Sequence, residues 1–168
     1  MQKITAAIEL MRIDKPIGIY LLLWPALLTL IVSTQGNFTL LQLGIVIIGS
    51  IVVRSAGCVI NDIWDKDIDG NVERTKFRPI PSKRISLTEA WLVFICLGAL
   101  SIYLLTLTNI NTMLVSILFA ILIVIYPLTK RFFIGPQLFL GLTFNPTVIV
   151  YAMTLSLIHI SEPTRPSQ

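Results

Sequence analysis

Long apolar runs alternate with short polar connections along most of this 168-residue chain. Four runs are long enough to form membrane helices, and they span about 16–32, 40–60, 87–107 and 113–127. Because about 20 apolar residues in a helix cross the hydrocarbon layer of a bilayer, each run predicts a transmembrane helix, the fourth being short. A fifth run begins near Gln137. The pattern therefore predicts an all-α, multi-pass transmembrane helical bundle with four full helices and a fifth.

Composition and charge agree with that fold and add an orientation. Charged residues make up 13% of the chain and hydrophobic residues 55%, whereas soluble domains carry about 25% charged residues. The connections 33–39 and 108–112 have no charge, while basic residues gather in the N-terminal tail and in the connections 61–86 and 127–136. Basic loops stay on the cytoplasmic side of a membrane, so we expect these three segments to face the cytoplasm. The net charge of +4 forms no basic stripe on a soluble face, which argues against a nucleic-acid partner.

The last residues break the pattern. The run that starts near Gln137 turns polar in its middle, at LSLIHISEPTRPSQ. Residues 155–165 back-translate readily to a DNA sequence that resembles a transposon-end adapter used in preparing sequencing libraries. We therefore expect 155–168 to be a non-native tail, and 1–154 to be the N-terminal part of a longer membrane domain. The alternative is a natural polar tail.

Carboxylates cluster where the second apolar run ends. A helix that continues to Asp69 turns about 100° per residue and places four side chains within one arc, namely Asn61, Asp62, Asp65 and Asp69. Asp67 falls on the far side of that helix, and Arg54, two turns earlier, falls on the same face as the arc. Gly70 marks the expected end of the helix. The spacing predicts a polar stripe of three carboxylates and one amide.

Like charges on one helix face repel each other, so this stripe needs a positive partner. Oxygen ligands without His or Cys suit Mg²⁺ or Ca²⁺, and ionisable groups continuous with a membrane helix mark functional sites. A cluster of basic residues follows at once, namely Arg74, Lys76, Arg78, Lys83 and Arg84. Carboxylates for a metal beside cations for anionic oxygens are what a metal-bound phosphate needs. The alternative is an ordinary solvated helix end at the membrane surface.

The stretch NDIWDKDIDGNVERTKFRPIP, at 61–81, resembles the first aspartate-rich motif of the UbiA-type intramembrane aromatic prenyltransferases. LMRIDKPIGIYLLLWPALL, RSAGCVIND and YPLTKRF agree with the same family, and the resemblance covers roughly 8–154. It implies a nine-helix bundle around a cavity open to the membrane, and a second aspartate-rich motif, which this sequence does not show. It also implies Mg²⁺-dependent transfer of a polyprenyl group from a polyprenyl diphosphate to an aromatic acceptor. The flanking stretches most resemble members that use 4-hydroxybenzoate in ubiquinone biosynthesis, in the lipid bilayer of the bacterial inner membrane.

The resemblance assigns roles to individual residues. Metal binding maps onto Asn61, Asp62, Asp65 and Asp69, the last two being also expected to be essential for catalysis. Diphosphate binding maps onto Arg74 and Arg78, with contact to lipid headgroups as the alternative. Lys130 and Arg131 are expected to bind substrate, with Arg131 at the aromatic carboxylate, unless the pair only sets topology. Arg54 either contacts a substrate or neutralises the aspartates.

Two other functions remain open at this stage. A cation-coupled transporter would use the aspartates as an ion site, but transporters place such sites near the bilayer midplane, and these carboxylates follow the end of an apolar run. A sister prenyltransferase would use another acceptor, such as a naphthoate, homogentisate or haem. Since the resemblance places a second aspartate-rich motif beyond this chain, we expect the 168-residue chain alone to be inactive.

Overall fold

Helices are the only regular secondary structure in the part of the chain that the structure describes. The computed structural model describes residues 2–70, 73, 75–108 and 110–129. Six helices occur in these residues, namely α1 (Gln2–Leu10), α2 (Ile17–Ser33), α3 (Leu40–Trp64), α4 (Lys66–Asp69), α5 (Leu87–Thr106) and α6 (Ile110–Thr129). The predicted all-α class is confirmed.

Two of the long helices begin at capping boxes. Thr39 accepts a hydrogen bond from the Gln42 backbone N–H at 3.2 Å, and the Gln42 side chain accepts one from the Thr39 backbone N–H at 2.8 Å. Ser86 and Glu89 make the same reciprocal pair at the start of α5, at 3.2 and 2.9 Å. Each cap satisfies backbone donors that lack a partner inside the helix, which stabilises the helix by about 1 kcal/mol. These caps explain why the apolar runs start their helices at Leu40 and Leu87.

The structure corrects one expectation about helix length and adds a helix for which the sequence analysis made no prediction. The fourth apolar run was expected to form a short helix over 113–127, yet α6 has 20 residues, because it begins at Ile110 and continues to Thr129. The N-terminal tail forms the nine-residue α1. Apolar runs mark the lipid-facing middle of a helix, whereas polar residues are tolerated at helix ends.

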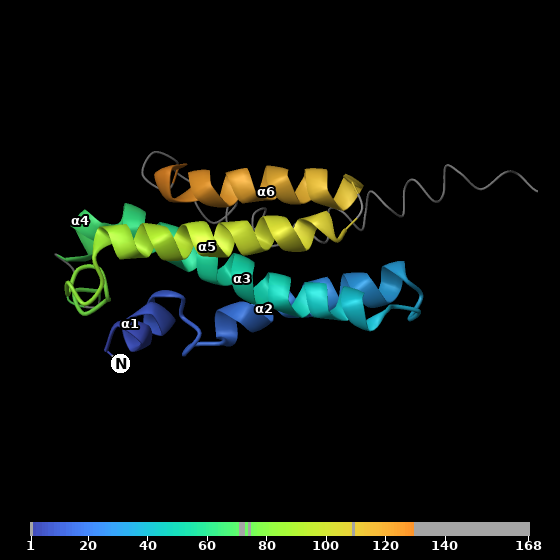
Figure 1. Cartoon of the computed structure of the whole chain (residues 1–168), viewed down its shortest axis with the longest axis horizontal. Helices are drawn as coiled ribbons and strands as arrows, with labels where there is room; N and C mark the ends of the chain where they lie inside the picture. Colours follow the sequence, from blue (N-terminus) through green and yellow to red (C-terminus); the bar gives the residue numbers. More distant parts are fainter. Residues whose placement is uncertain (1, 71–72, 74, 109, 130–168) are drawn as a thin grey trace, which may run out of the picture.

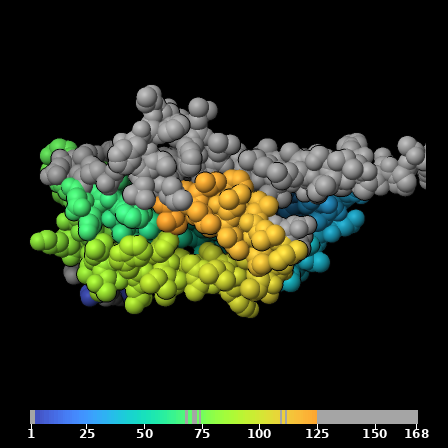
Figure 2. Space-filling model, turned by 90° about the horizontal axis from the view of Figure 1, so that it is seen from above, coloured from blue at the N-terminus to red at the C-terminus, as the bar shows by residue number. Residues whose placement is uncertain are grey.

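The long helices run side by side and alternate in direction (Figure 1). α3 lies at the centre of the bundle and packs against α1, α2, α5 and α6. α1, α4 and the segment 75–86 gather at the end of the bundle where α3 ends and α5 begins. α5 and α6 lie next to each other along the face that Figure 2 presents. We call the end that holds α1 and α4 the polar end.

Many large apolar side chains lie on the surface of the described helices. Trp24, Leu40 and Ile102 are 63%, 86% and 65% exposed, and α5 buries only Ala90 and Leu104. α3 and α5 are long and apolar enough to cross a membrane, and α2 and the stretch Thr112–Val124 are shorter apolar helices. Such a surface suits lipid, which solvates apolar side chains but not open backbone groups.

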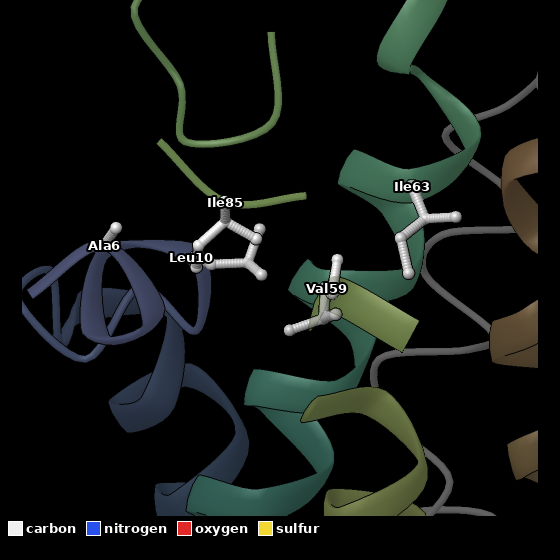
Figure 3. Packing of buried hydrophobic residues seen from close by; sticks show 6 residues of the cluster. Ala6, Leu10, Val59, Ile63 and Ile85 are labelled. Atoms are coloured by element: carbon white, nitrogen blue, oxygen red, sulfur yellow. The ribbon is translucent and has the colours of Figure 1, made fainter. Parts of the chain in front are cut away.

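A small hydrophobic core fixes the polar end. Its buried residues are Ala6, Leu10, Val59, Ile63, Ile85 and Ala90. Figure 3 shows Leu10 on α1 next to Ile85 from the loop before α5, with Ala6 on their α1 side and with Val59 and Ile63 on their α3 side. Leu10 is completely buried, and burying such a side chain contributes about 1.5–3 kcal/mol. This core holds α1 against the end of α3, next to the carboxylates.

Candidate functional site

The carboxylate stripe follows the end of α3. The Asp65 backbone N–H bonds to the Asn61 carbonyl at 2.9 Å, and the Asp69 N–H bonds to the Asp65 carbonyl at 2.8 Å. These bonds keep the helical phase although the helix is interrupted at Asp65, so the expected unbroken helix was nearly correct. α4 ends at Asp69, directly before Gly70.

Burial separates the aspartates into two groups. Asp62, Asp65 and Asp69 are 2%, 7% and 6% exposed, whereas Asp67 is exposed to solvent. Asn61 is half-buried. The three carboxylates that helical phase placed on one arc are therefore also the three that the fold buries. Buried carboxylates are costly unless they are paired, and their partners determine what the site can bind.

Arginines from two distant segments compensate this stripe. Arg78 Nη1 donates to Asp62 Oδ1 at 3.1 Å and to Asp69 Oδ2 at 2.5 Å. Arg12 Nη2 donates to Asp62 Oδ1 at 2.9 Å. We call Arg12, Asp62, Asp65, Asp69 and Arg78 the acid–arginine cluster. The cluster contains three carboxyl groups and two guanidinium groups.

A hydrogen-bonded turn brings Arg78 to the stripe. Thr75 is buried, and its hydroxyl donates to the Asp69 carbonyl at 2.9 Å. The Arg78 backbone N–H then bonds to the Thr75 carbonyl at 3.0 Å, and the Ser82 N–H bonds to the Arg78 carbonyl at 3.0 Å. The turn is thus anchored to the end of α4, which aims Arg78 back at Asp62 and Asp69. Arg78 was a predicted site residue, and the structure brings it to the aspartates.

Arg12 reaches the site from the turn after α1. Its backbone has φ +54°, in the left-handed region that non-glycine residues seldom adopt. The turn is closed by hydrogen bonds from the Arg12 N–H to the Glu9 carbonyl and from the Lys15 N–H to the Arg12 carbonyl. The sequence analysis gave Arg12 no role at the site. No local signal could have found it, because its partner Asp62 lies 50 residues further along the chain.

Ion pairs hold α1 in the position that delivers Arg12. Glu9 Oε2 lies 2.7 Å from Arg84 Nη2, and Lys3 Nζ lies 2.6 Å from Glu89 Oε1. The hydrogen bond from Arg84 lowers the pKa of Glu9 below its ordinary value, and the carboxylate in turn raises the pKa of Arg84. Both pairs are partly solvated, so each stabilises the fold only slightly. The buried Ala6 and Leu10 hold α1 in place more strongly.

Of the remaining predicted site residues, the structure describes Arg54 and does not describe the other three. Arg54 lies on α3, half-buried, eight residues before Asp62, which is about 12 Å along a helix. Arg74, Lys130 and Arg131 lie outside the described residues, so their predicted roles stay predictions.

The stripe fits a hard divalent cation by the chemistry of its donors. Asn61, Asp62, Asp65 and Asp69 offer only oxygen ligands, which Mg²⁺ prefers. Among 2–70, 73, 75–108 and 110–129, however, no three side chains of Asp, Glu, His or Cys come close enough to hold an ion by themselves. The stripe therefore suits a cation whose other ligands come from elsewhere. Buried carboxylates beside guanidinium groups are also the combination that binds a metal together with phosphate oxygens.

Comparison with known proteins gives a consistent set of relatives. Residues 22–162 match the sequence profile described as the UbiA prenyltransferase family. The 4-hydroxybenzoate octaprenyltransferase of Idiomarina loihiensis is 45% identical over 145 residues, which are 86% of this chain and 51% of that protein. The protein of the same name from Vibrio vulnificus is 46% identical over 147 residues, with the same two coverages. The chain thus spans about half the length of the curated relatives that it matches.

Two solved structures have a similar fold. A UbiA homologue from Aeropyrum pernix K1 is 29% identical with a TM-score of 0.70, over 83% of this chain and 50% of that protein. A digeranylgeranylglyceryl phosphate synthase has a TM-score of 0.77 at 23% identity, over 91% of this chain and 53% of its own. The second comparison bears on the fold alone.

Proposed function

Since the chain belongs to the UbiA prenyltransferase family, we propose that it is part of a membrane enzyme that transfers a polyprenyl group from a polyprenyl diphosphate to 4-hydroxybenzoate. The observation that carries this proposal is the acid–arginine cluster, which lies where an apolar helix ends. An enzyme of this class must hold an anionic diphosphate beside an apolar space for the prenyl tail. The two relatives at 45% and 46% identity, both named 4-hydroxybenzoate octaprenyltransferase, support the choice of acceptor.

The reaction breaks the carbon–oxygen bond between the prenyl group and its diphosphate. The electrons of that bond leave with the diphosphate, and a carbon of the aromatic ring attacks the allylic cation. The ring then loses a proton, which restores its aromaticity. The charge that accumulates on the departing diphosphate is therefore what the protein must stabilise.

Each residue of the stripe has a role in that stabilisation. Asp65 and Asp69, with Asn61 and Asp62, would hold Mg²⁺, and the ion would supply the positive charge that neutralises the departing diphosphate. Arg78, together with Arg74, donates hydrogen bonds to phosphate oxygens. Lys130 and Arg131 bind substrate, with Arg131 at the aromatic carboxylate. The surrounding apolar helices exclude water, which would otherwise capture the allylic cation.

The proposal includes a location. The polar end, with the N-terminal tail and the 61–86 connection, faces the cytoplasm, and the membrane is the bacterial inner membrane. The uncharged 33–39 and 108–112 connections face outward.

We also propose that a longer protein completes the site. The chain spans about half of its relatives' length, and the stripe offers ligands from one side only. A second aspartate-rich motif in the remaining half would provide the facing ligands, and residues 155–168 would not be native. Resequencing the source locus with a different library chemistry tests this. A stop codon directly after Gln168, with LSLIHISEPTRPSQ still present, would contradict it.

The activity test uses the complete protein and a set of acceptors. Purified protein in lipid nanodiscs receives a polyprenyl diphosphate, Mg²⁺ and either 4-hydroxybenzoate, a dihydroxynaphthoate or homogentisate, and mass spectrometry identifies the product. We expect prenylated 4-hydroxybenzoate, lost when a chelator removes Mg²⁺. Turnover of another acceptor alone would replace 4-hydroxybenzoate in the proposal. Activity of the 168-residue chain alone would contradict the need for a second half.

A further inference from the structure

A glycine on α2 lies directly against an arginine on α3. If Gly18 carried a Cβ atom, that atom would lie 2.5 Å from Arg54 Nε, 2.7 Å from Nη2 and 2.9 Å from Cζ. Such separations are shorter than any ordinary contact between a carbon and another heavy atom. The guanidinium group of Arg54 therefore occupies a position that only glycine permits at residue 18.

Other helical glycines do not have this property. A Cβ at Gly44, Gly49 or Gly98 would meet nothing within 4 Å, and at Gly57 it would make an ordinary contact of 3.7 Å with Ile123. Glycine is less favourable than alanine inside a helix, so its presence is explained where a close approach requires it. Among the glycines of the described helices, Gly18 has such an explanation.

The residue that Gly18 accommodates is itself costly. Arg54 lies within α3, a helix apolar enough to cross a membrane, and ionisable groups in such helices usually serve function. Seven residues separate Arg54 from Asn61, which is two turns, so both share one face of the helix. The charge of Asp62 is compensated by Arg12 and Arg78. Two arginines besides Arg54 therefore already compensate that aspartate.

We propose that Gly18 is a positioning residue, which admits the Arg54 guanidinium to a place where it binds an anionic oxygen group of a substrate. That group is either the diphosphate of the prenyl donor or the carboxylate of the aromatic acceptor. Guanidinium binds both groups through paired hydrogen bonds whose geometry depends on the position of its plane. The inference rests on the proposed function for the identity of the substrates, but the placement of Arg54 against Gly18 does not.

A methyl group at residue 18 should displace the Arg54 guanidinium without changing the packing of α2 against α3. The atoms that it would meet belong to the far end of a flexible side chain, so the guanidinium moves and the helices keep their packing. We expect Gly18→Ala to leave the melting temperature of the protein unchanged or slightly higher, because alanine favours the helix. We expect the affinity of the Gly18→Ala variant for substrate to fall.

The first arm of the test follows the guanidinium itself in the 168-residue chain. Arginine side chains are labelled with ¹⁵N, and loss of one signal in Arg54→Lys assigns the Nε–Hε resonance of Arg54. We expect that resonance to shift in Gly18→Ala and to stay in place in the control Gly44→Ala. An unchanged resonance in Gly18→Ala would overturn the placement.

The second arm measures steady-state kinetics in the complete protein for both substrates. We expect Gly18→Ala to raise the KM of one substrate by about tenfold to a hundredfold, because a charge-assisted hydrogen bond to that substrate is lost. We expect kcat to change little. The substrate whose KM rises identifies the group that Arg54 binds. In an Arg54→Gln background, Gly18→Ala should add no further loss.

Unchanged KM values for both substrates, or the same loss in the Arg54→Gln background, would overturn the inference. A wild-type protein that turns over neither substrate would refute the proposed function instead, and the first arm then decides the role of Gly18.

Discussion

The guanidinium group of Arg12 lies 2.9 Å from the carboxylate of Asp62, although 50 residues separate the two along the chain. The Asp62 side chain is 3% exposed and the Arg12 side chain 32% exposed. This contact joins the turn after α1 to the end of α3, and it makes the N-terminal segment part of the candidate site.

Replacing Arg12 should destabilise the protein. Arg12→Ala removes one partner of a buried carboxylate, while Arg78 remains as the other. Because Arg12 is partly solvated and Arg78 stays in place, we expect a loss of about 1–2 kcal/mol, less than for a buried pair broken completely. Thermal unfolding in detergent micelles, followed by circular dichroism, measures it. Lys3→Ala, which breaks an exposed pair, serves as the control, and an equal effect of both changes would contradict the prediction.

The backbone at Arg12 offers a second measurement. Its φ of +54° costs a residue with a Cβ about 1 kcal/mol or more, whereas glycine adopts it freely. Arg12→Gly should therefore unfold at a higher temperature than Arg12→Ala, although glycine usually destabilises a chain. The reverse order would mean that the left-handed turn does not persist in the folded protein.

The burial of the aspartates predicts a graded effect on activity. In the complete protein, Asp65→Ala and Asp69→Ala should reduce prenyl transfer by about a thousandfold or more, because charge stabilisation of a leaving group contributes several kcal/mol. Asp67→Ala should change kcat/KM by less than about threefold, since surface substitutions are usually almost neutral. Product formation measured by mass spectrometry distinguishes them. Equal losses for Asp67→Ala and Asp69→Ala would refute the single-face arrangement.

The turn that carries Arg78 depends on a buried hydroxyl. Thr75→Val keeps the shape of the side chain and removes the hydrogen bond to the Asp69 carbonyl. We expect a stability loss of about 1–2 kcal/mol and a higher KM for the prenyl diphosphate, because Arg78 is held less firmly. Thr106→Val, at the opposite end of the bundle, is the matched control. If Thr75→Val left both the melting temperature and KM unchanged, the turn would not depend on this bond.

Acid should loosen α1. The pKa of Glu9 is lowered in the folded protein by the hydrogen bond from Arg84, relative to an ordinary value of 4.5. The stabilisation from this pair is therefore fully present above pH 4.5 and is lost as the pH falls through the lowered pKa. Hydrogen exchange of the α1 amides should accelerate over that range in the wild type. In Glu9→Gln the acceleration should be smaller, and what remains comes from the Lys3–Glu89 pair, because the hydrogen bond from Lys3 lowers the pKa of Glu89 to about 2. An identical pH profile in Glu9→Gln would show that Glu9 does not contribute.

Cysteine labelling tests the orientation. In a Cys96→Ala background, a membrane-impermeant maleimide added to intact cells should label Asn37→Cys and should not label Ser82→Cys. Cys58 is buried and should stay unlabelled in both. Labelling of Ser82→Cys without permeabilisation would reverse the assignment.

Much of the local structure could be predicted from the sequence. Apolar runs bounded by Thr39 and Ser86 gave correct helix starts, because capping depends on residues only three positions apart. The turn of about 100° per residue separated Asp67 from the buried carboxylates, because helical phase also depends on residues only a few positions apart. The pairing of Arg12 with Asp62, and the close approach of Arg54 to Gly18, could not be predicted, because tertiary packing alone brings such residues together. α1 was missed because its nine residues are too short and too polar to form an apolar run.

The position of α1 has a consequence for biosynthesis. Ala6 and Leu10 leave the ribosome before the surface on which they pack, which includes Val59, Ile85 and Ala90. α1 can therefore dock only after about half of this chain has been synthesised and α3 and α5 have entered the bilayer. Contacts between residues far apart in sequence form late, because a long segment must first be ordered. Until then the aspartates at the end of α3 lack Arg12, so a segment that is made before α3 completes its contact with α3 only after α5 has been made.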